Sequence, residues 1–274
     1  MDSFHPEFVD AYAFSKESRF KFKIHDILFS FTVFEKSPSY FKSSHLKNLL
    51  QEFLRVHKNM YPHNIITKTN VNIVIYDILL KKQLPAAEMA IKAEHINSGY
   101  CFVNSTMDST NIVIYRREEL YKVLIHELLH FFNTVPTNQD IQNRFSALFT
   151  SVSNTIVVNE AVVELHALCM NCRVIANLTN EPYMDLLYAE YDFSIKQIRK
   201  LLTQQNVKFD CIMKNKFEWN EKTHAFSYFV LKHIFFSHML GLSLGSISNQ
   251  FKYSKKPVRG NNYIKMTTNA YNFN

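Results

Sequence analysis

The sequence predicts an α+β fold, with a mixed β-sheet and helices in the N-terminal half and a mainly helical C-terminal half. Three observations lead to this prediction. Runs of β-branched and aromatic residues are concentrated before Pro136. Beyond Pro136, apolar residues recur mainly at helical spacing. With 274 residues, 47% of them hydrophobic and 20% charged, the chain is long enough for one large domain or two lobes that share a core.

Strand and helix patterns alternate through the first 80 residues. Residues 19–34 alternate and then become continuously apolar and aromatic, which predicts one long strand or two strands. The stretch "HLKNLLQEFLRVHKNMY", 45–61, follows helical spacing, and "VNIVIYDILL", 71–80, is β-branched and strand-like. The expected order is therefore strand, helix, strand.

A connecting region and a hairpin are expected next. Residues 81–99 are punctuated by Pro85 and Gly99, which favours a connection. The runs "YCFVN", 100–104, and "NIVIYR", 111–116, flank the polar "STMDST", as a β-hairpin requires.

The next helix contains "YKVLIHELLHFFN", 121–133. Its expected start is near Glu118 and Glu119, because acidic side chains suit a helix N-terminus. It must stop before Pro136, since proline breaks a helix.

Helical patterns dominate the rest of the chain. The expected helices lie around 138–152, 155–176, 182–204 and 222–241. We expect one domain, 1–274, of two lobes: about 1–136 mixed α/β and about 137–250 helical, followed by a polar basic tail at 251–274.

Charge and cysteine content restrict the expected partners. The formal net charge of +7 favours association with acidic peptides or proteins through long-range steering. Basic residues are spread along the chain without a recognition motif, so we do not expect nucleic acid as the main partner. The four cysteines form neither a disulfide framework nor a zinc ribbon.

No membrane span or leader is expected. The longest apolar stretch, 225–245, is interrupted by Lys232, His233 and His238, which favours a buried helix. The N-terminus lacks a basic region followed by an apolar one, so we expect no secretory signal and a cytoplasmic location. The sequence leaves the oligomeric state open.

His126, Glu127 and His130 are the first candidate site residues. In a helix, His126 and His130 are about 40° apart around the axis and about 6 Å apart along it, so both rings can bind one ion. Neutral imidazole nitrogens suit Zn²⁺. Glu127 is about 100° further round, beside the metal, where it can take a proton from a bound water. Without a metal, these polar groups would need other partners among Leu124, Ile125, Leu128 and Leu129.

The stretch His126-Glu127-Leu128-Leu129-His130 is an HExxH motif and resembles the active-site helix of zincin metallopeptidases. The resemblance implies a mixed sheet whose edge strand lines the substrate cleft. Because "NIVIYR", 111–116, directly precedes the helix, we expect it to be that edge strand and to pair with a peptide substrate. The metzincin extension is absent, since "FFNTVPTN" follows His130.

A zincin needs a third protein ligand. Downstream, "VVNEAVVELHA" places Glu160 and Glu164 four residues apart on one helix face, which resembles the gluzincin arrangement. The resemblance implies that Glu160 ligates the metal and that Glu164 accepts the second nitrogen proton of His126 or His130. Glu164 replaces the usual aspartate, so a swap of the two roles stays open. His166 is expected to point away from this face.

The implied activity is zinc-dependent hydrolysis of peptide bonds, with Glu127 as general base. An oxyanion donor is also needed. "THAFSYFVLKH" contains His224, Tyr228 and His233, and resembles in part the downstream His or Tyr of gluzincins. We take His224 and Tyr228 as candidates.

Two alternatives remain beside the peptidase. One is a catalytically inactive zincin-like scaffold that binds an acidic partner. The other is a di-iron carboxylate bundle, which would need a second Glu-x-x-His that the sequence lacks. The chain also resembles HExxH proteins of large DNA viruses in "INSGY", "NEAVVE" and "FSYFVLK", which would imply host cytoplasm or a virion as the location.

Overall fold

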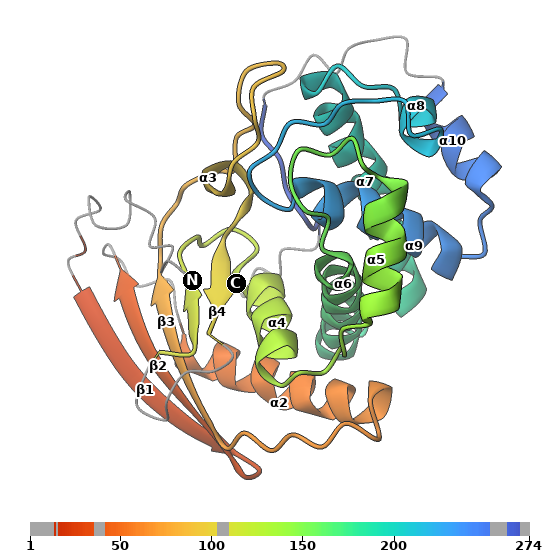
Figure 1. Ribbon diagram of the computed structural model, residues 1–274. Helices are drawn as coiled ribbons and strands as arrows, with labels where there is room; N and C mark the ends of the chain where they lie inside the picture. Colours follow the sequence, from red (N-terminus) through yellow and green to blue (C-terminus); the bar gives the residue numbers. More distant parts are fainter. Residues whose placement is uncertain (1–13, 15, 36–41, 103–109, 253–261, 269–274) are drawn as a thin grey trace.

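The N-terminal half contains a five-stranded mixed sheet, in a computed structural model that describes residues 14, 16–35, 42–102, 110–252 and 262–268 (Figure 1). The strands are β1 Lys16–Ile24, β2 Ile27–Glu35, β3 Asn70–Tyr76, β4 Gly99–Cys101 and β5 Ile112–Ile114. Their order in the sheet is β1-β2-β3-β5-β4. The predicted α+β class is confirmed.

The strand at 19–34 is a hairpin. β1 and β2 pair antiparallel from Lys16 opposite Glu35 to Ile24 opposite Ile27, and His25 in the turn has a φ of 52°. Positive φ is typical of a tight hairpin turn. β3 pairs parallel with β2 and β5, and ends before the predicted residue 80.

The prediction that 111–116 forms the edge strand is wrong. β5 lies between β3 and β4, and β4 pairs antiparallel with β5, Gly99 opposite Ile114, at the edge of the sheet. All three residues of β5 are buried, which agrees with its uninterrupted apolar sequence. The first strand of the predicted hairpin is thus the exposed one. The turn residues 103–109 lie outside the described part of the chain.

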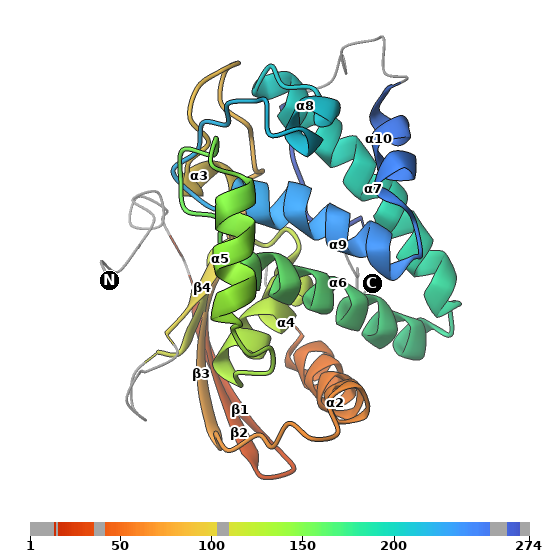
Figure 2. The same ribbon diagram turned by 45° about the vertical axis from the view of Figure 1, so that its right-hand side comes forward.

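Two helices cover one face of this sheet (Figure 2). They are α2 Ser43–Met60 and α4 Leu120–Phe131; the short α3 Ala93–Ile96 lies in the connection before β4. The apolar positions of α2 are buried at helical spacing against the sheet and α4. α4 ends before Asn133, whose φ of 49° is a left-handed conformation that asparagine tolerates.

Glu119 does not have the expected role at the start of α4. It is the N-cap residue, but its side chain makes no capping hydrogen bond. Instead its carboxylate is buried and lies 2.6 Å from Nζ of Lys82. The expectation failed because a buried ammonium and the backbone N–H groups of Met266 and Thr267 bind this carboxylate.

The C-terminal half is helical, as predicted. Its elements are α5 Gln139–Leu148, α6 Val158–Thr179, α7 Tyr183–Gln204, α8 Phe209–Met213, the π-helix η1 Phe226–Leu231, α9 Lys232–Met239 and α10 Leu244–Lys252. α6 contributes buried side chains to all three large apolar clusters of the described residues. It therefore joins the core under the sheet to the core of the helical half.

By length and composition α6 could also cross a membrane. However, 72% of its apolar window is buried inside the molecule, as expected of a central core helix.

The predicted polar tail, 251–274, needs correction where it is described. α10 extends to Lys252, and 253–261 and 269–274 lie outside the described residues. In 262–268, Ile264, Met266 and Thr267 are buried. Polar composition did not predict this, because the partners of the segment come from distant elements.

Candidate metal centre

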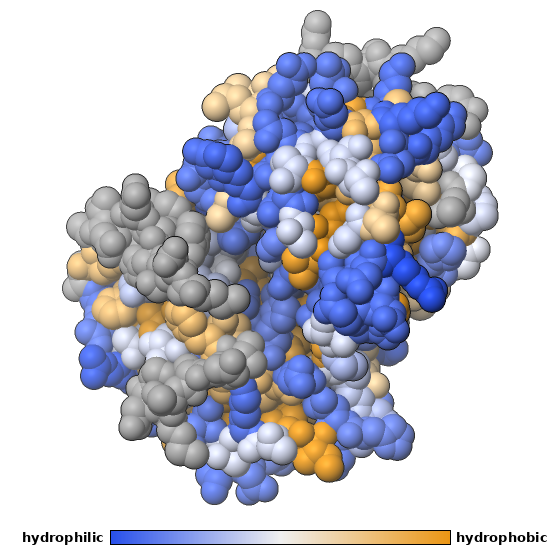
Figure 3. Space-filling view, viewed as in Figure 1, coloured by the Kyte–Doolittle hydropathy of each residue, from blue (hydrophilic) through white to orange (hydrophobic). Residues whose placement is uncertain are grey.

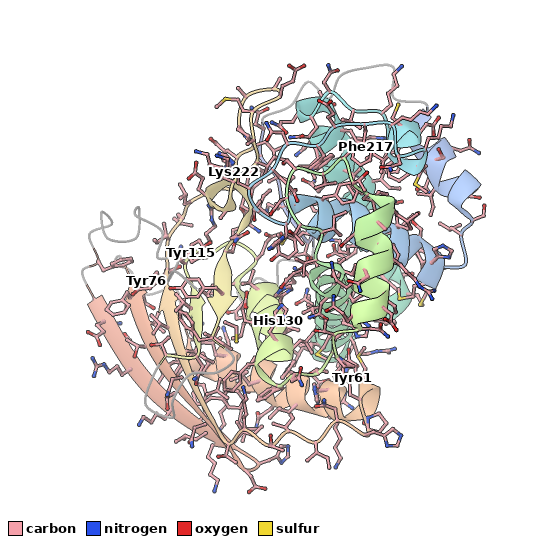
Figure 4. The ribbon with its side chains drawn as sticks, viewed as in Figure 1. Tyr61, Tyr76, Tyr115, His130, Phe217 and Lys222 are labelled. Atoms are coloured by element: carbon pink, nitrogen blue, oxygen red, sulfur yellow. The ribbon has the colours of Figure 1, made fainter. Side chains whose placement is uncertain are left out.

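His126 and His130 lie one turn apart on α4, which packs against both the sheet and α6. Figure 4 labels His130 on this helix. Their Nε2 atoms are 3.1 Å apart. The helix sets this separation, because residues i and i+4 share a face. Only 7% of His126 is exposed.

Glu160, on α6, completes a cluster with the two imidazoles. Its Oε2 lies 3.3 Å from Nε2 of His130 and 3.5 Å from Nε2 of His126. Three ligands at tetrahedral corners, each 2.0 to 2.1 Å from Zn²⁺, would lie about 3.3 to 3.4 Å from one another. The three residues therefore fit such an ion.

The electrostatics of the cluster favour a positive charge. Burial alone would lower the pKa of His126, but Glu160, Glu164 and Glu127 outweigh it and raise the pKa to about 9. Burial alone would raise the pKa of Glu160, but His126 and His130 hold it well below its usual range. A metal ion would satisfy the same carboxylates.

Glu164 lies behind His126, not among the three-atom cluster. Its Oε2 is 2.9 Å from Nδ1 of His126, while Oε1 is bound by Nζ of Lys122 and lies 3.7 Å from Nζ of Lys232. All three charged side chains are buried. An acceptor at Nδ1 leaves the Nε2 lone pair of His126 facing Glu160 and His130. This geometry favours Glu160 over Glu164 as the ligand.

Glu127 lines a cavity of about 30 Å³ together with His126 and Tyr228. The cavity is large enough for a water molecule. A Cβ atom built on Gly99 of the edge strand would lie 3.4 Å from Oε1 of Glu127. Burial is the main cause that raises the pKa of Glu127. In the space-filling view, the surface between the sheet and α5 is hollowed (Figure 3).

Tyr228 reaches the cluster from the π-helix η1. Its ring centroid lies 6.1 Å from that of His126, and its hydroxyl is close enough to Glu160 for that carboxylate to affect its pKa. Burial, with the charges of Glu160, Glu127 and Glu164, raises the pKa of Tyr228 well above 10, so the hydroxyl is a proton donor. π-Helical turns often occur at functional sites.

The other predicted histidines do not join the cluster. His224 is half-buried, its ring centroid is 6.4 Å from that of Tyr228, and it is not among the residues that line the cavity. His233 is bonded to Ser194, and His166 to Tyr61, which are packing roles.

Sequence analysis missed Lys122, Ser98 and Met266, which also line the cavity. The sequence could have indicated Lys122, because this residue lies one turn before His126 on the same helix face. Ser98 and Met266 had none, since tertiary packing brings them to α4.

A second cavity, of about 780 Å³, contains none of these residues. Phe217, which lines it, lies at the far end of the helical half from His130 (Figure 4). Its lining has no group of metal-ligating side chains among the described residues. The smaller cavity at Glu127 is therefore the candidate site.

Comparison with known proteins gives distant structural similarity only. No protein-family model and no curated protein sequence matches the chain. The solved structure of an aminopeptidase N family protein from Idiomarina loihiensis is similar, with a TM-score of 0.43 and 10% sequence identity. The match covers 86% of this chain and 40% of that chain. At this identity and score we transfer neither residues nor activity. Nothing in these comparisons supports the resemblance to viral HExxH proteins.

Proposed function

We propose that the protein is a zinc-dependent peptidase of gluzincin type. The main support is the cluster of His126 Nε2, His130 Nε2 and Glu160 Oε2, with separations of 3.1 to 3.5 Å that match a tetrahedral zinc site. These three residues would hold the metal.

Glu127 would act as the general base. Bound Zn²⁺ would polarise the scissile carbonyl and lower the pKa of the attacking water. Glu127 follows the candidate ligand His126 directly on α4, so its carboxylate would accept the proton and return it to the leaving amine. Its raised pKa suits both steps.

Glu164 and Tyr228 would support this chemistry. Oε2 of Glu164 lies 2.9 Å from Nδ1 of His126, where it would hold the proton of that nitrogen and orient the ring. The hydroxyl of Tyr228 remains protonated and lies beside the cluster, so we favour it over His224 as donor to the oxyanion.

The substrate would be a peptide that pairs with the edge strand β4 rather than with β5. β4 has one free edge in the described sheet and its Gly99 adjoins Glu127. The net charge of +7 favours an acidic peptide or protein.

Metal content tests this proposal. We expect about one zinc per chain in purified, dialysed wild type and its loss in His126→Ala, measured by plasma mass spectrometry. His238→Ala is the matched control, because His238 is an exposed histidine on α9.

A folded wild type that lacks metal and does not take up added zinc would contradict the proposal. Stoichiometric zinc without hydrolysis of any peptide would instead favour the inactive scaffold for an acidic partner.

A further inference from the structure

Residues 262–268 are anchored beside the candidate metal centre by two buried carboxylates. Oε1 of Glu119 accepts hydrogen bonds from the backbone N–H of Met266, at 2.5 Å, and of Thr267, at 2.7 Å. Oε1 of Glu190, on α7, is bound by the hydroxyl of Thr267 and accepts from the backbone N–H of Thr268 at 3.1 Å. Both carboxylates are buried, so the backbone of this segment is fixed.

This anchoring places the side chain of Met266 in the cavity at Glu127. Met266 is 7% exposed, and its Sδ lies 3.7 Å from Nζ of Lys122. It lines the cavity together with Glu127, His126 and Tyr228. The segment therefore forms part of the wall of the candidate site.

The other residues that line the cavity cannot move far to enlarge it. Gly99 already lacks a side chain, and a Cβ there would lie 2.9 Å from Cγ1 of Val123 and 2.9 Å from the carbonyl oxygen of Val113. Gly99 and Val123 belong to β4 and α4, which are held by the sheet and the core. Met266 is the flexible part, because methionine has three rotatable bonds.

The hydroxyl of Ser98, which lines the cavity, indicates what kind of group the cavity would bind. Ser98 is 4% exposed, and its Oγ has no hydrogen-bond partner among the described residues. A buried hydroxyl without a partner is costly, so a ligand atom or a water is expected there. The volume of about 30 Å³ matches a group of about the size of a methyl or a hydroxyl.

We propose that this cavity takes a glycine, alanine or serine of the substrate next to the scissile bond, and that Met266 sets the upper limit of size. The proposal rests on the proposed peptidase function. Met266 would be a specificity-determining residue, and Ser98 would donate to, or accept from, the bound residue.

Cleavage of a mixture of synthetic peptides tests the size limit. Zinc-loaded wild type should cut only where a glycine, alanine or serine occupies one fixed position beside the bond. Met266→Ala should also accept leucine or methionine at that position. Met239→Ala, an exposed methionine on α9, should keep the wild-type profile. Large residues accepted by wild type on both sides of the bond, or a Met266→Ala profile identical to wild type, would overturn the proposal.

Binding of two zinc-chelating probes gives a test without catalysis. Acetohydroxamate carries a methyl group and hexanohydroxamate a five-carbon chain. Wild type should bind acetohydroxamate more tightly, by roughly tenfold or more, since even one methylene discriminates by 10-fold or more in a pocket. Met266→Ala should reduce or reverse this ratio.

The possible failures are distinguishable. A wild type without zinc would overturn the proposed function and this proposal with it. A zinc-loaded wild type that binds both probes equally would overturn this proposal alone. A wild type that binds neither while Met266→Ala binds both would also overturn it, and would show that 262–268 closes the site.

Discussion

His126 differs from the other buried histidines of this protein in its carboxylate neighbours. His57 and His233 are also buried, and burial lowers the pKa of His57 to about 4 and of His233 to about 3. At His126 the same burial is outweighed by Glu160, Glu164 and Glu127, and the pKa rises to about 9. At residue scale, the site is therefore a place where a cation is favoured inside the core.

Glu127→Gln should abolish hydrolysis while leaving the fold and the zinc in place. Glutamine has the same shape but cannot accept the proton of the attacking water. We expect a loss of about 10² to 10⁴ in kcat. The measurement is peptide turnover alongside zinc content and circular dichroism. Retention of wild-type turnover would rule out Glu127 as general base.

Gly99→Ala should destabilise the edge strand. The new Cβ would lie 2.9 Å from the carbonyl oxygen of Val113, a backbone atom that cannot yield without distorting the β4–β5 pair. We expect a loss of about 1 to 3 kcal/mol in the free energy of unfolding, measured in urea.

Gly245→Ala is the control for this change. Gly245 is in α10, and no atom lies closer than 3.9 Å to its added Cβ. The control should be neutral or slightly stabilising, because alanine favours helix. Equal effects of the two changes would show that the contact at Gly99 relaxes without cost.

At the scale of elements, the π-helix η1 brings Tyr228 to the cluster, and Glu221 lies at its start. Oε2 of Glu221 accepts from the backbone N–H of Phe226 at 2.8 Å and from Nε1 of Trp219 at 2.9 Å. Burial, only partly offset by these bonds, raises the pKa of Glu221 from 4.5 to about 7. The folded protein therefore holds this proton more tightly than the unfolded chain.

Glu221→Gln should remove a pH dependence of stability. Between pH 4.5 and 7 the folded wild type binds more protons at Glu221 than the unfolded chain. Its free energy of unfolding should therefore fall as pH rises through this window, by on the order of 3 kcal/mol from this group. The difference between urea unfolding of wild type and of Glu221→Gln, measured from pH 4 to 8, isolates this contribution. Parallel curves would contradict it.

Elements also show where sequence patterns succeed and fail. Long periodic helices were predicted correctly, because the apolar faces of α2, α6 and α7 extend over many turns. The edge strand was misassigned, because the sequence of a hairpin does not show which of its two strands pairs with the rest of the sheet. The π-helical turn at Phe226–Leu231 left no pattern in the sequence that distinguishes it from an α-helix.

At the scale of the whole molecule, buried ion pairs join distant segments. Lys82 and Glu119 form a pair at 2.6 Å with no exposed side-chain surface, and Glu119 also holds Met266 and Thr267. The start of α4, the loop after β3 and the segment 262–268 thus meet at one carboxylate.

Glu119→Gln should destabilise the protein strongly. The ammonium of Lys82 would stay buried without a charged partner, at a cost of about 3 to 5 kcal/mol in urea unfolding. Glu118→Gln is the matched control, because Glu118 pairs with the partly exposed Lys265. Its cost should stay near or below about 1 kcal/mol. Similar losses of unfolding free energy in both variants would mean that the buried pair stabilises the protein no more than the partly exposed pair does.

The sequence by itself placed His126 and His130 on one helix face, and Glu160 and Glu164 on one face of another helix, because helical spacing fixes which side chains share a face. It also determined the α+β class and most helices, since hydrophobic periodicity is local. Only the tertiary structure decided that Glu160 joins the imidazoles while Glu164 lies behind His126, that β4 is the edge strand, and that 262–268 enters the interior. These features depend on contacts between residues far apart in the chain, and local patterns contain no information on which distant carboxylate, strand or segment will be the partner.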